Sequence, residues 1–123
     1  MSQTFRPGVK TCYASDSPSS IFSAVFEDDG DTGYFYAYDR AQQESPILDA
    51  VHVYNVSSAG DIDDAILEVA WSADGLKAAL LIDGHPHALI DFQQRCSSSR
   101  TGFPAASTSW RRGVWSYDVM ESF

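Results

Sequence analysis

The residues best suited to chemistry are two histidines and an aspartate near the end of one apolar stretch, VAWSADGLKAALLIDGHPHALIDF (69–92). His85, His87 and Asp91 offer imidazole nitrogens and a carboxylate, the ligands that Zn²⁺ and similar divalent metals take in proteins. On a continuous strand, His85 and His87 would point to the same face. These three residues are the candidate metal site, and a metal there would make the protein a small metal-dependent hydrolase or another enzyme.

The neighbours of this group favour a different interpretation. Gly84 and Pro86 predict a turn, so the two-residue period of a strand does not hold between the histidines. The apolar even-numbered positions from 88 to 92 face the core, which directs His87 and Asp91 outward onto an open surface. His52 would supply a third imidazole only if its strand lies beside the hairpin. Exposed turn histidines are therefore the alternative to a metal site.

A second group of oxygen ligands lies in the acidic turn EDDGDTG (27–33). Glu27, Asp28, Asp29 and Asp31 surround a glycine, and hard oxygen ligands in a flexible turn can bind Ca²⁺. Their spacing does not match that of an EF-hand loop. The alternative is a solvated hairpin turn.

Tyrosines alternate along the segment that follows this turn. A strand over 34–39 places Tyr34, Tyr36 and Tyr38 on one face. Such a row can bind a protein or a flat ligand, or it can pack against neighbouring strands while its hydroxyls stay in water. With the carboxylates of the turn it forms the ligand or partner surface that the sequence predicts: Tyr34, Tyr36, Tyr38, Asp28, Asp29 and Asp31.

The remaining sequence offers no strong catalytic pattern. The serine clusters lie in loops without a G-x-S-x-G elbow, and the acidic glycine turn would repel a nucleotide phosphate. The two cysteines, Cys12 and Cys96, lack metal-binding spacing, and we expect them to be free thiols. We therefore assign no catalytic residue and no cofactor, apart from the divalent metal considered above.

The charge of the chain restricts the classes of partner that it can bind. The 123 residues carry 17 acidic and 8 basic side chains, a net charge of −9. Between Glu27 and Asp91 there are 14 carboxylates against Arg40 and Lys77. Nucleic acids and anionic membranes bind basic surfaces, so we expect neither as a partner. The acidic charge favours a basic protein partner, or it serves only to keep an aromatic-rich domain soluble.

Short strands separated by tight turns run through most of the chain. Residue alternation and β-branched and aromatic side chains predict six strands, over 20–28, 34–39, 47–56, 65–72, 76–83 and 87–92. The first two should form a hairpin. The predicted fold class is all-β, with α+β as the alternative. It is an antiparallel meander of six or seven strands with few short helices, forming a curved sheet, a sandwich or a partly closed barrel.

The length restricts the chain to a single domain. Residues 1–19 are polar and predict an N-terminal arm or an irregular edge, which leaves 20–123 as the β domain. One helical turn fits 40–46, and 93–107 reads as loop. The segment 108–123 fits either a helix or a strand; since Gly113 weakens a helix, we expect a short turn and a closing strand. The open edges of a meander also allow a homodimer through a sheet edge.

Four segments occur in the order typical of one bacterial family: FEDDGDTGYFYAYD, ILDAVHVYNV, WSADGLKAALLIDGHPHALIDF and CSSSRTGFP. They extend from about Phe22 to Pro104, and they resemble the family called domain of unknown function 2251. The resemblance implies a bacterial source and a single domain. It transfers no activity and no catalytic residue to this chain.

These features together predict a non-enzymatic bacterial binding or interaction protein with an acidic surface. We expect it in the cytoplasm, because the start has no apolar signal core and no segment approaches the roughly 20 apolar residues of a membrane helix. One version is a small acidic protein that neutralises a basic toxin, as bacterial immunity proteins do, by analogy of charge and size. The alternative is the metal-dependent enzyme centred on His85, His87 and Asp91.

Overall fold

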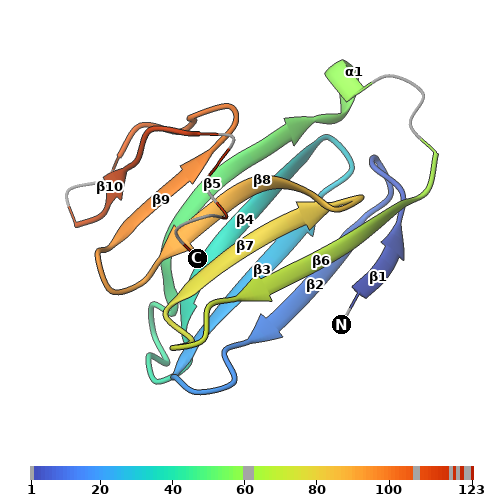
Figure 1. Cartoon of the computed structure of the whole chain (residues 1–123). Coiled ribbons are helices and arrows are strands. Elements are labelled where there is room, and N and C mark those ends of the chain that lie inside the picture. The colour runs from blue at the N-terminus through green and yellow to red at the C-terminus, as the bar shows by residue number, and fades with distance from the viewer. Residues whose placement is uncertain (1, 60–62, 107–108, 117, 119, 121–122) are drawn as a thin grey trace.

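The computed structural model is a sandwich of two β-sheets (Figure 1). It describes residues 2–59, 63–106, 109–116, 118, 120 and 123. The strands are β1 (Ser2–Phe5), β2 (Thr11–Asp16), β3 (Phe22–Asp28), β4 (Thr32–Asp39), β5 (Ile47–Asn55), β6 (Ala65–Trp71), β7 (Lys77–Ile82), β8 (His85–Asp91), β9 (Cys96–Ser99) and β10 (Arg111–Arg112), and one short helix, α1 (Val56–Ala59), follows β5.

The strands form a four-stranded sheet in the order β2-β3-β4-β5 and a six-stranded sheet in the order β1-β6-β7-β8-β9-β10. All neighbouring pairs are antiparallel except β9 and β10, which are parallel. The all-β prediction is confirmed, and of the three predicted arrangements the structure has the sandwich. The predicted meander is divided between two sheets, because the chain crosses from one sheet to the other after β1 and again after β5.

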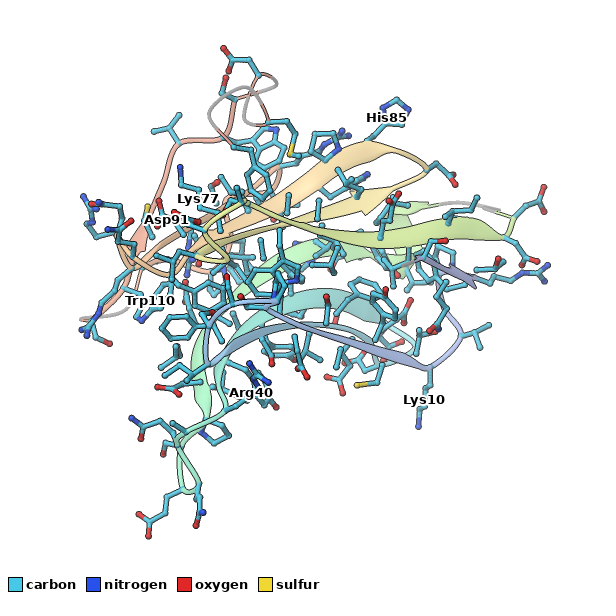
Figure 2. The ribbon with its side chains drawn as sticks, turned by 60° about the horizontal axis from the view of Figure 1, so that its bottom comes forward. Lys10, Arg40, Lys77, His85, Asp91 and Trp110 are labelled. Atoms are coloured by element: carbon cyan, nitrogen blue, oxygen red, sulfur yellow. The ribbon has the colours of Figure 1, made fainter. Side chains whose placement is uncertain are left out.

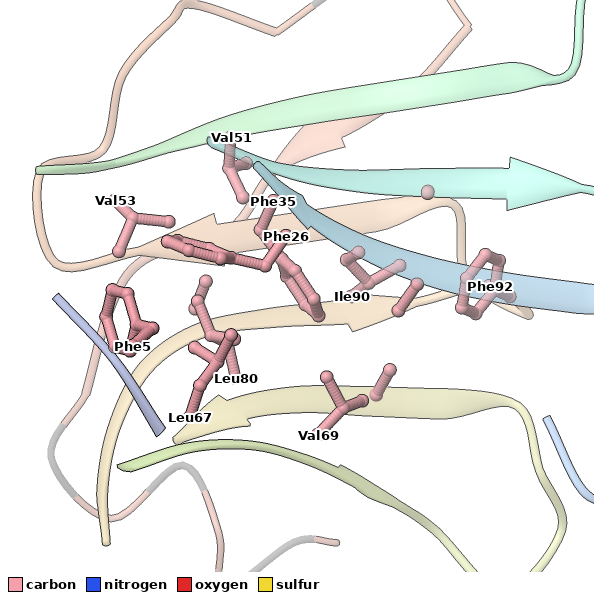
Figure 3. Packing of buried hydrophobic residues seen from close by; sticks show 14 of the residues in the cluster. Phe5, Phe26, Phe35, Val51, Val53, Leu67, Val69, Leu80, Ile90 and Phe92 are labelled. Carbon is pink, nitrogen blue, oxygen red and sulfur yellow. The ribbon is translucent and has the colours of Figure 1, made fainter. Parts of the chain in front are cut away.

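The core lies between the two sheets (Figure 3). Successive side chains of a strand point to opposite faces, so every second residue of the central strands is directed inward. The largest buried apolar side chains come from both sheets: Phe26, Phe35 and Val51 from one, and Leu67, Leu80 and Ile90 from the other. Both layers therefore bury one apolar face against each other, which explains why alternation was visible in the sequence.

The six predicted strands are all present, but three further strands, β1, β2 and β9, were not predicted. Residues 1–19 were expected to be an arm or an irregular edge, whereas β1 and β2 form one regular edge strand of each sheet. Their sequences are polar because an edge strand buries few side chains: β1 buries only Phe5. The prediction of a loop over 93–107 is wrong for β9, a CSSS segment that pairs with β8 and is buried from Ser97 to Ser99.

Two smaller predictions also differ from the structure. Residues 40–46 form turns and bends without a helix, and the helical turn is α1 instead. In the ambiguous segment 108–123, a bend at Ser109 and Trp110 precedes the two-residue strand β10, which is parallel to β9. The prediction of a closing strand near the end falls partly on residues 117, 119 and 121–122, which lie outside the described residues.

A buried ion pair joins the edges of the two sheets. Arg112 of β10 donates from its two terminal nitrogens to the carboxylate of Asp49 on β5, at 2.8 and 3.1 Å. The two side chains are only 10% and 5% exposed. The Nε–H of Arg112 also donates to the carbonyl oxygen of Pro104, at 2.9 Å. One arginine thus fixes β10, β5 and the loop that follows β9.

We predict that Arg112→Met lowers the free energy of unfolding by about 3 kcal/mol, because it leaves the Asp49 carboxylate buried without its cation. The double variant Asp49→Asn with Arg112→Met should regain a large part of this loss. Urea denaturation measures both effects. The matched control is Arg6→Met, which breaks the pair between Arg6 and Asp64, where both side chains are more than half exposed, and should cost less than about 1 kcal/mol. Equal losses for the two arginine variants would contradict a structural role for the buried pair.

Candidate functional site

The predicted tyrosine row lies on the outer face of the four-stranded sheet. In β4, Phe35 and Ala37 point inward and are fully buried, so Tyr34, Tyr36 and Tyr38 point outward and are half-buried. The rings of Tyr34 and Tyr36 stack, with centroids 6.1 Å apart and planes at 26°. Neighbouring tyrosines of one strand therefore pack on each other at this face while their side chains stay partly exposed.

Glu27 of β3 lies opposite Tyr34, on the same outer face. Its carboxylate accepts a hydrogen bond from the hydroxyl of Tyr36, at 3.1 Å. Burial, followed by the charge of Glu27 and this hydrogen bond, raises the pKa of Tyr36 to about 12. Tyr36 is therefore a protonated donor at any physiological pH, and its hydroxyl is held against a carboxylate.

The acidic turn between β3 and β4 closes through its own side chains. The carboxylate of Asp29 accepts the backbone N–H groups of Thr32 and Asp31, at 2.8 and 2.9 Å. These two hydrogen bonds, that of Thr32 first, hold the pKa of Asp29 below its usual value. Asp29 and Asp31 are exposed, so both carboxylates lie at the end of the tyrosine row. We call the set Tyr34, Tyr36, Tyr38, Glu27, Asp29 and Asp31 the tyrosine face.

Asp28 does not belong to this surface, although the sequence analysis placed it there. It is 1% exposed and points inward. Its two oxygens accept hydrogen bonds from the backbone N–H groups of Gly30 and Gly8 and from the hydroxyl of Tyr54, the last at 2.6 Å. Burial, followed by this hydrogen bond and the charge of Asp28, raises the pKa of Tyr54. Asp28 therefore joins β3 to β5 and to the turn before β2, and its oxygens already have partners that a Ca²⁺ ion would have to displace.

A recess adjoins the tyrosine face at the edge formed by β5. It has a volume of about 490 Å³ and is lined by Thr32, Tyr34, His52, Asn55, Thr101 and Phe103. The loop after β9 covers β5 here, because the backbone N–H of His52 donates to the carbonyl oxygen of Phe103 at 2.7 Å. The sequence contains no local signal for this contact, since Phe103 lies in a segment that reads as loop.

The imidazole of His52 is held from both sides. Its Nδ1 lies 3.0 Å from the hydroxyl oxygen of Thr101, and its Nε2 lies 2.9 Å from the side-chain oxygen of Asn55. The ring is 7% exposed. His52 therefore positions the loop and the recess, and it does not join the other two histidines as a metal ligand.

The structure separates Asp91 from the two histidines of the predicted metal site, which line the same cavity. His85 and Asp91 lie at opposite ends of β8, and Figure 2 shows Asp91 beside Lys77, away from His85. The carboxylate of Asp91 accepts the backbone N–H of Gln94, at 2.9 Å. Within the described residues, no group of three His, Cys, Asp or Glu side chains is arranged to hold a metal ion. The two cysteines, Cys12 and Cys96, are free thiols.

His87 is directed inward, contrary to the expectation that it faces an open surface. Leu80 pairs with Ala88 and Leu81 with Pro86, so His87 is the extra residue of a β-bulge. Its imidazole lines a mainly apolar cavity of about 320 Å³, which also includes Tyr54 from the opposite sheet. Burial, followed by the charges of Arg100 and His85, lowers the pKa of His87 to about 4. A neutral imidazole therefore fills part of the space between the sheets.

Residues 5–123 match the family described as an uncharacterized protein conserved in bacteria (DUF2251). The chain belongs to this family. It is 46% identical over 84 residues to an uncharacterized protein of Haemophilus influenzae. The match covers 68% of this chain and 52% of the relative, so it spans about half the length of that protein. No solved structure matches the chain. The family resemblance expected from the four sequence segments is confirmed, and it brings no assigned activity.

The described part of the chain contains no helix long and apolar enough to cross a membrane.

The lowered pKa of His87 predicts an acid-sensitive contribution to stability. The unfolded chain takes up a proton near pH 6.5, whereas the folded protein resists protonation down to about pH 4. The contribution is complete above pH 6.5 and is lost as the pH falls toward 4, by roughly 1–2 kcal/mol for this partly exposed ring. His87→Gln should flatten this part of the pH dependence, measured by urea denaturation at pH 7 and pH 4.5. His85→Gln, at the exposed neighbouring histidine, is the matched control and should keep most of the dependence, because burial is the main cause of the lowered pKa. If the free energy of unfolding depends on pH in the same way for the parent and for His87→Gln, then His87 is not the source of this acid sensitivity.

Proposed function

We propose that this protein is a non-enzymatic cytoplasmic binding protein whose tyrosine face binds a basic protein partner. The supporting observation is the row of half-buried tyrosines bordered by three carboxylates. Glu27, Asp29 and Asp31 form no salt bridge within the described residues, whereas Asp16 on the same sheet pairs with Arg40. The face therefore combines aromatic contact area with negative charge that a partner can complement.

Tyrosine suits this role for physical reasons. Its ring supplies a large contact area with few rotatable bonds, and its hydroxyl can bind polar groups, so tyrosine is enriched in protein interfaces. The rings of Tyr34 and Tyr36 are already stacked, and the hydroxyl of Tyr36 is already bonded to Glu27. A partner therefore meets side chains whose positions are largely fixed, and less conformational entropy is lost on binding.

The net charge of −9 supports a basic partner. Complementary charge accelerates association and suppresses binding to acidic competitors. One concrete form of this proposal is an immunity-like protein that neutralises a basic toxin, which rests on charge and size alone. The enzyme alternative has less support, because the three residues on which it depends do not lie together.

Site-specific photo-crosslinking from the tyrosine face tests the proposal. A photo-reactive amino acid replaces Tyr36 in the full chain, expressed in the bacterial cell that contains it. We expect crosslinks to one basic protein. The matched control carries the same group in place of Ile66, which is 50% exposed on β6 of the other sheet, and should not yield that protein.

Binding measurements with the purified partner then test whether aromatic contact and charge hold the proposed interface together. Tyr36→Ala and Glu27→Gln should each weaken binding, Tyr36→Ala by about tenfold or more for a central aromatic contact. Affinity should fall as salt rises, because exposed charges are screened. The same crosslinks from both positions, or an affinity that neither salt nor Glu27→Gln changes, would exclude the proposed interface.

A further inference from the structure

The recess at the edge of the tyrosine face is built from three aromatic rings. The ring of Tyr34 lies 5.5 Å from that of His52, with an interplanar angle of 76°. The ring of Phe103 lies 5.8 Å from His52, at 88°. Tyr34 and Phe103 thus each meet the buried imidazole edge to face, and both side chains are partly exposed. The volume of about 490 Å³ lies in the range of small ligand sites, about 300–1,000 Å³.

The imidazole of His52 and the backbone of Phe103 are held in place by hydrogen bonds. His52 is held by Thr101 and Asn55 through its two ring nitrogens. Phe103 is 56% exposed, yet its carbonyl oxygen is bonded to the backbone N–H of His52. The exposure of this phenylalanine is therefore a property of an anchored loop. Rigid aromatic walls lower the entropic cost of binding.

The charge at the recess favours a cation. The hydroxyl of Thr32, one of the lining residues, lies 3.3 and 3.4 Å from the two oxygens of Asp29. The exposed carboxylate of Asp31 belongs to the same turn. None of the described residues that line the recess is lysine or arginine. Aromatic faces attract cations through the negative charge of their π systems, and nearby carboxylates add to that attraction.

We infer that this recess binds an arginine side chain presented by a basic protein partner. A guanidinium group is planar, stacks on aromatic faces and carries five N–H donors, which suits a site with two partly exposed rings and several oxygen acceptors. The stacking of Tyr34 on Tyr36 makes the recess continuous with the tyrosine face, so a side chain is better placed than a free small molecule. This inference rests on the proposed function, since it names the group by which that partner is recognised.

The first test uses a defined probe and the full chain. N-acetyl-arginine methylamide is titrated while the ring signals of Tyr34 and Phe103 are followed by NMR. We expect both to shift, with millimolar affinity. The citrulline analogue has nearly the same shape without the charge, and should bind much more weakly. Equal shifts with the two probes would overturn the inference.

Two variants test whether the arginine probe binds at the recess. Phe103→Ala should weaken binding of the arginine probe about threefold or more, the size of an exposed cation–π contact. Tyr34→Leu should do the same. Ile66→Ala, which trims an equally exposed apolar side chain on the other sheet, should leave the affinity unchanged. Retention of the parent affinity by both ring variants would overturn the inference.

The two proposals can fail separately, because the probe titration needs no partner. If the arginine probe binds as expected but crosslinking from position 36 finds no basic protein, the proposed function fails while the recess remains an arginine site. If a basic partner is found and binds Phe103→Ala as tightly as the parent, the recess lies outside that interface and the inference is wrong.

Discussion

Arg112 is the residue on which the arrangement of this sandwich most depends. Its ion pair with Asp49 joins the edge strands of two sheets, and its third hydrogen bond fixes the carbonyl of Pro104. The next residue back, Phe103, is bonded to His52 and forms one wall of the recess. A charge buried without its partner is costly, so this contact tolerates few alternatives. One structural ion pair thus controls the position of a surface loop that carries the candidate binding site.

Polar contacts of this kind recur where the two sheets meet their loops. Asp28 binds Tyr54 and two backbone N–H groups, and His52 binds Thr101 and Asn55. The apolar core determines that the sheets pack, because burial is non-directional. Hydrogen bonds are directional, so they determine how the edges and loops are placed. The fold therefore uses apolar residues for cohesion and a few buried polar residues for precise placement.

The tyrosine face follows from this division of roles between apolar and polar side chains. Alternation in β4 sends Phe35 and Ala37 into the core and the tyrosines outward, so the same strand packs the core on one side and carries the proposed binding surface on the other. The carboxylate of Asp29 closes the acidic turn by accepting two of its backbone N–H groups. The turn therefore needs no bound ion to hold its shape. Negative charge remains at the rim of an aromatic surface, and the proposed basic partner would complement this charge.

The sequence by itself determined the six strands β3 to β8, the all-β class and the outward tyrosine row, because each depends on local alternation and short-range turns. The family was recognised from the resemblance of four sequence segments. It could not determine the polar strands β1, β2 and β9, which are held by backbone pairing and bury few apolar residues of their own. Only the tertiary structure decided the rest. It buried Asp28, turned His87 inward through a bulge, separated His85 from Asp91, and brought Phe103 beside His52. These outcomes depend on register and on contacts between residues far apart in the chain, which the periodicity of a single strand does not record.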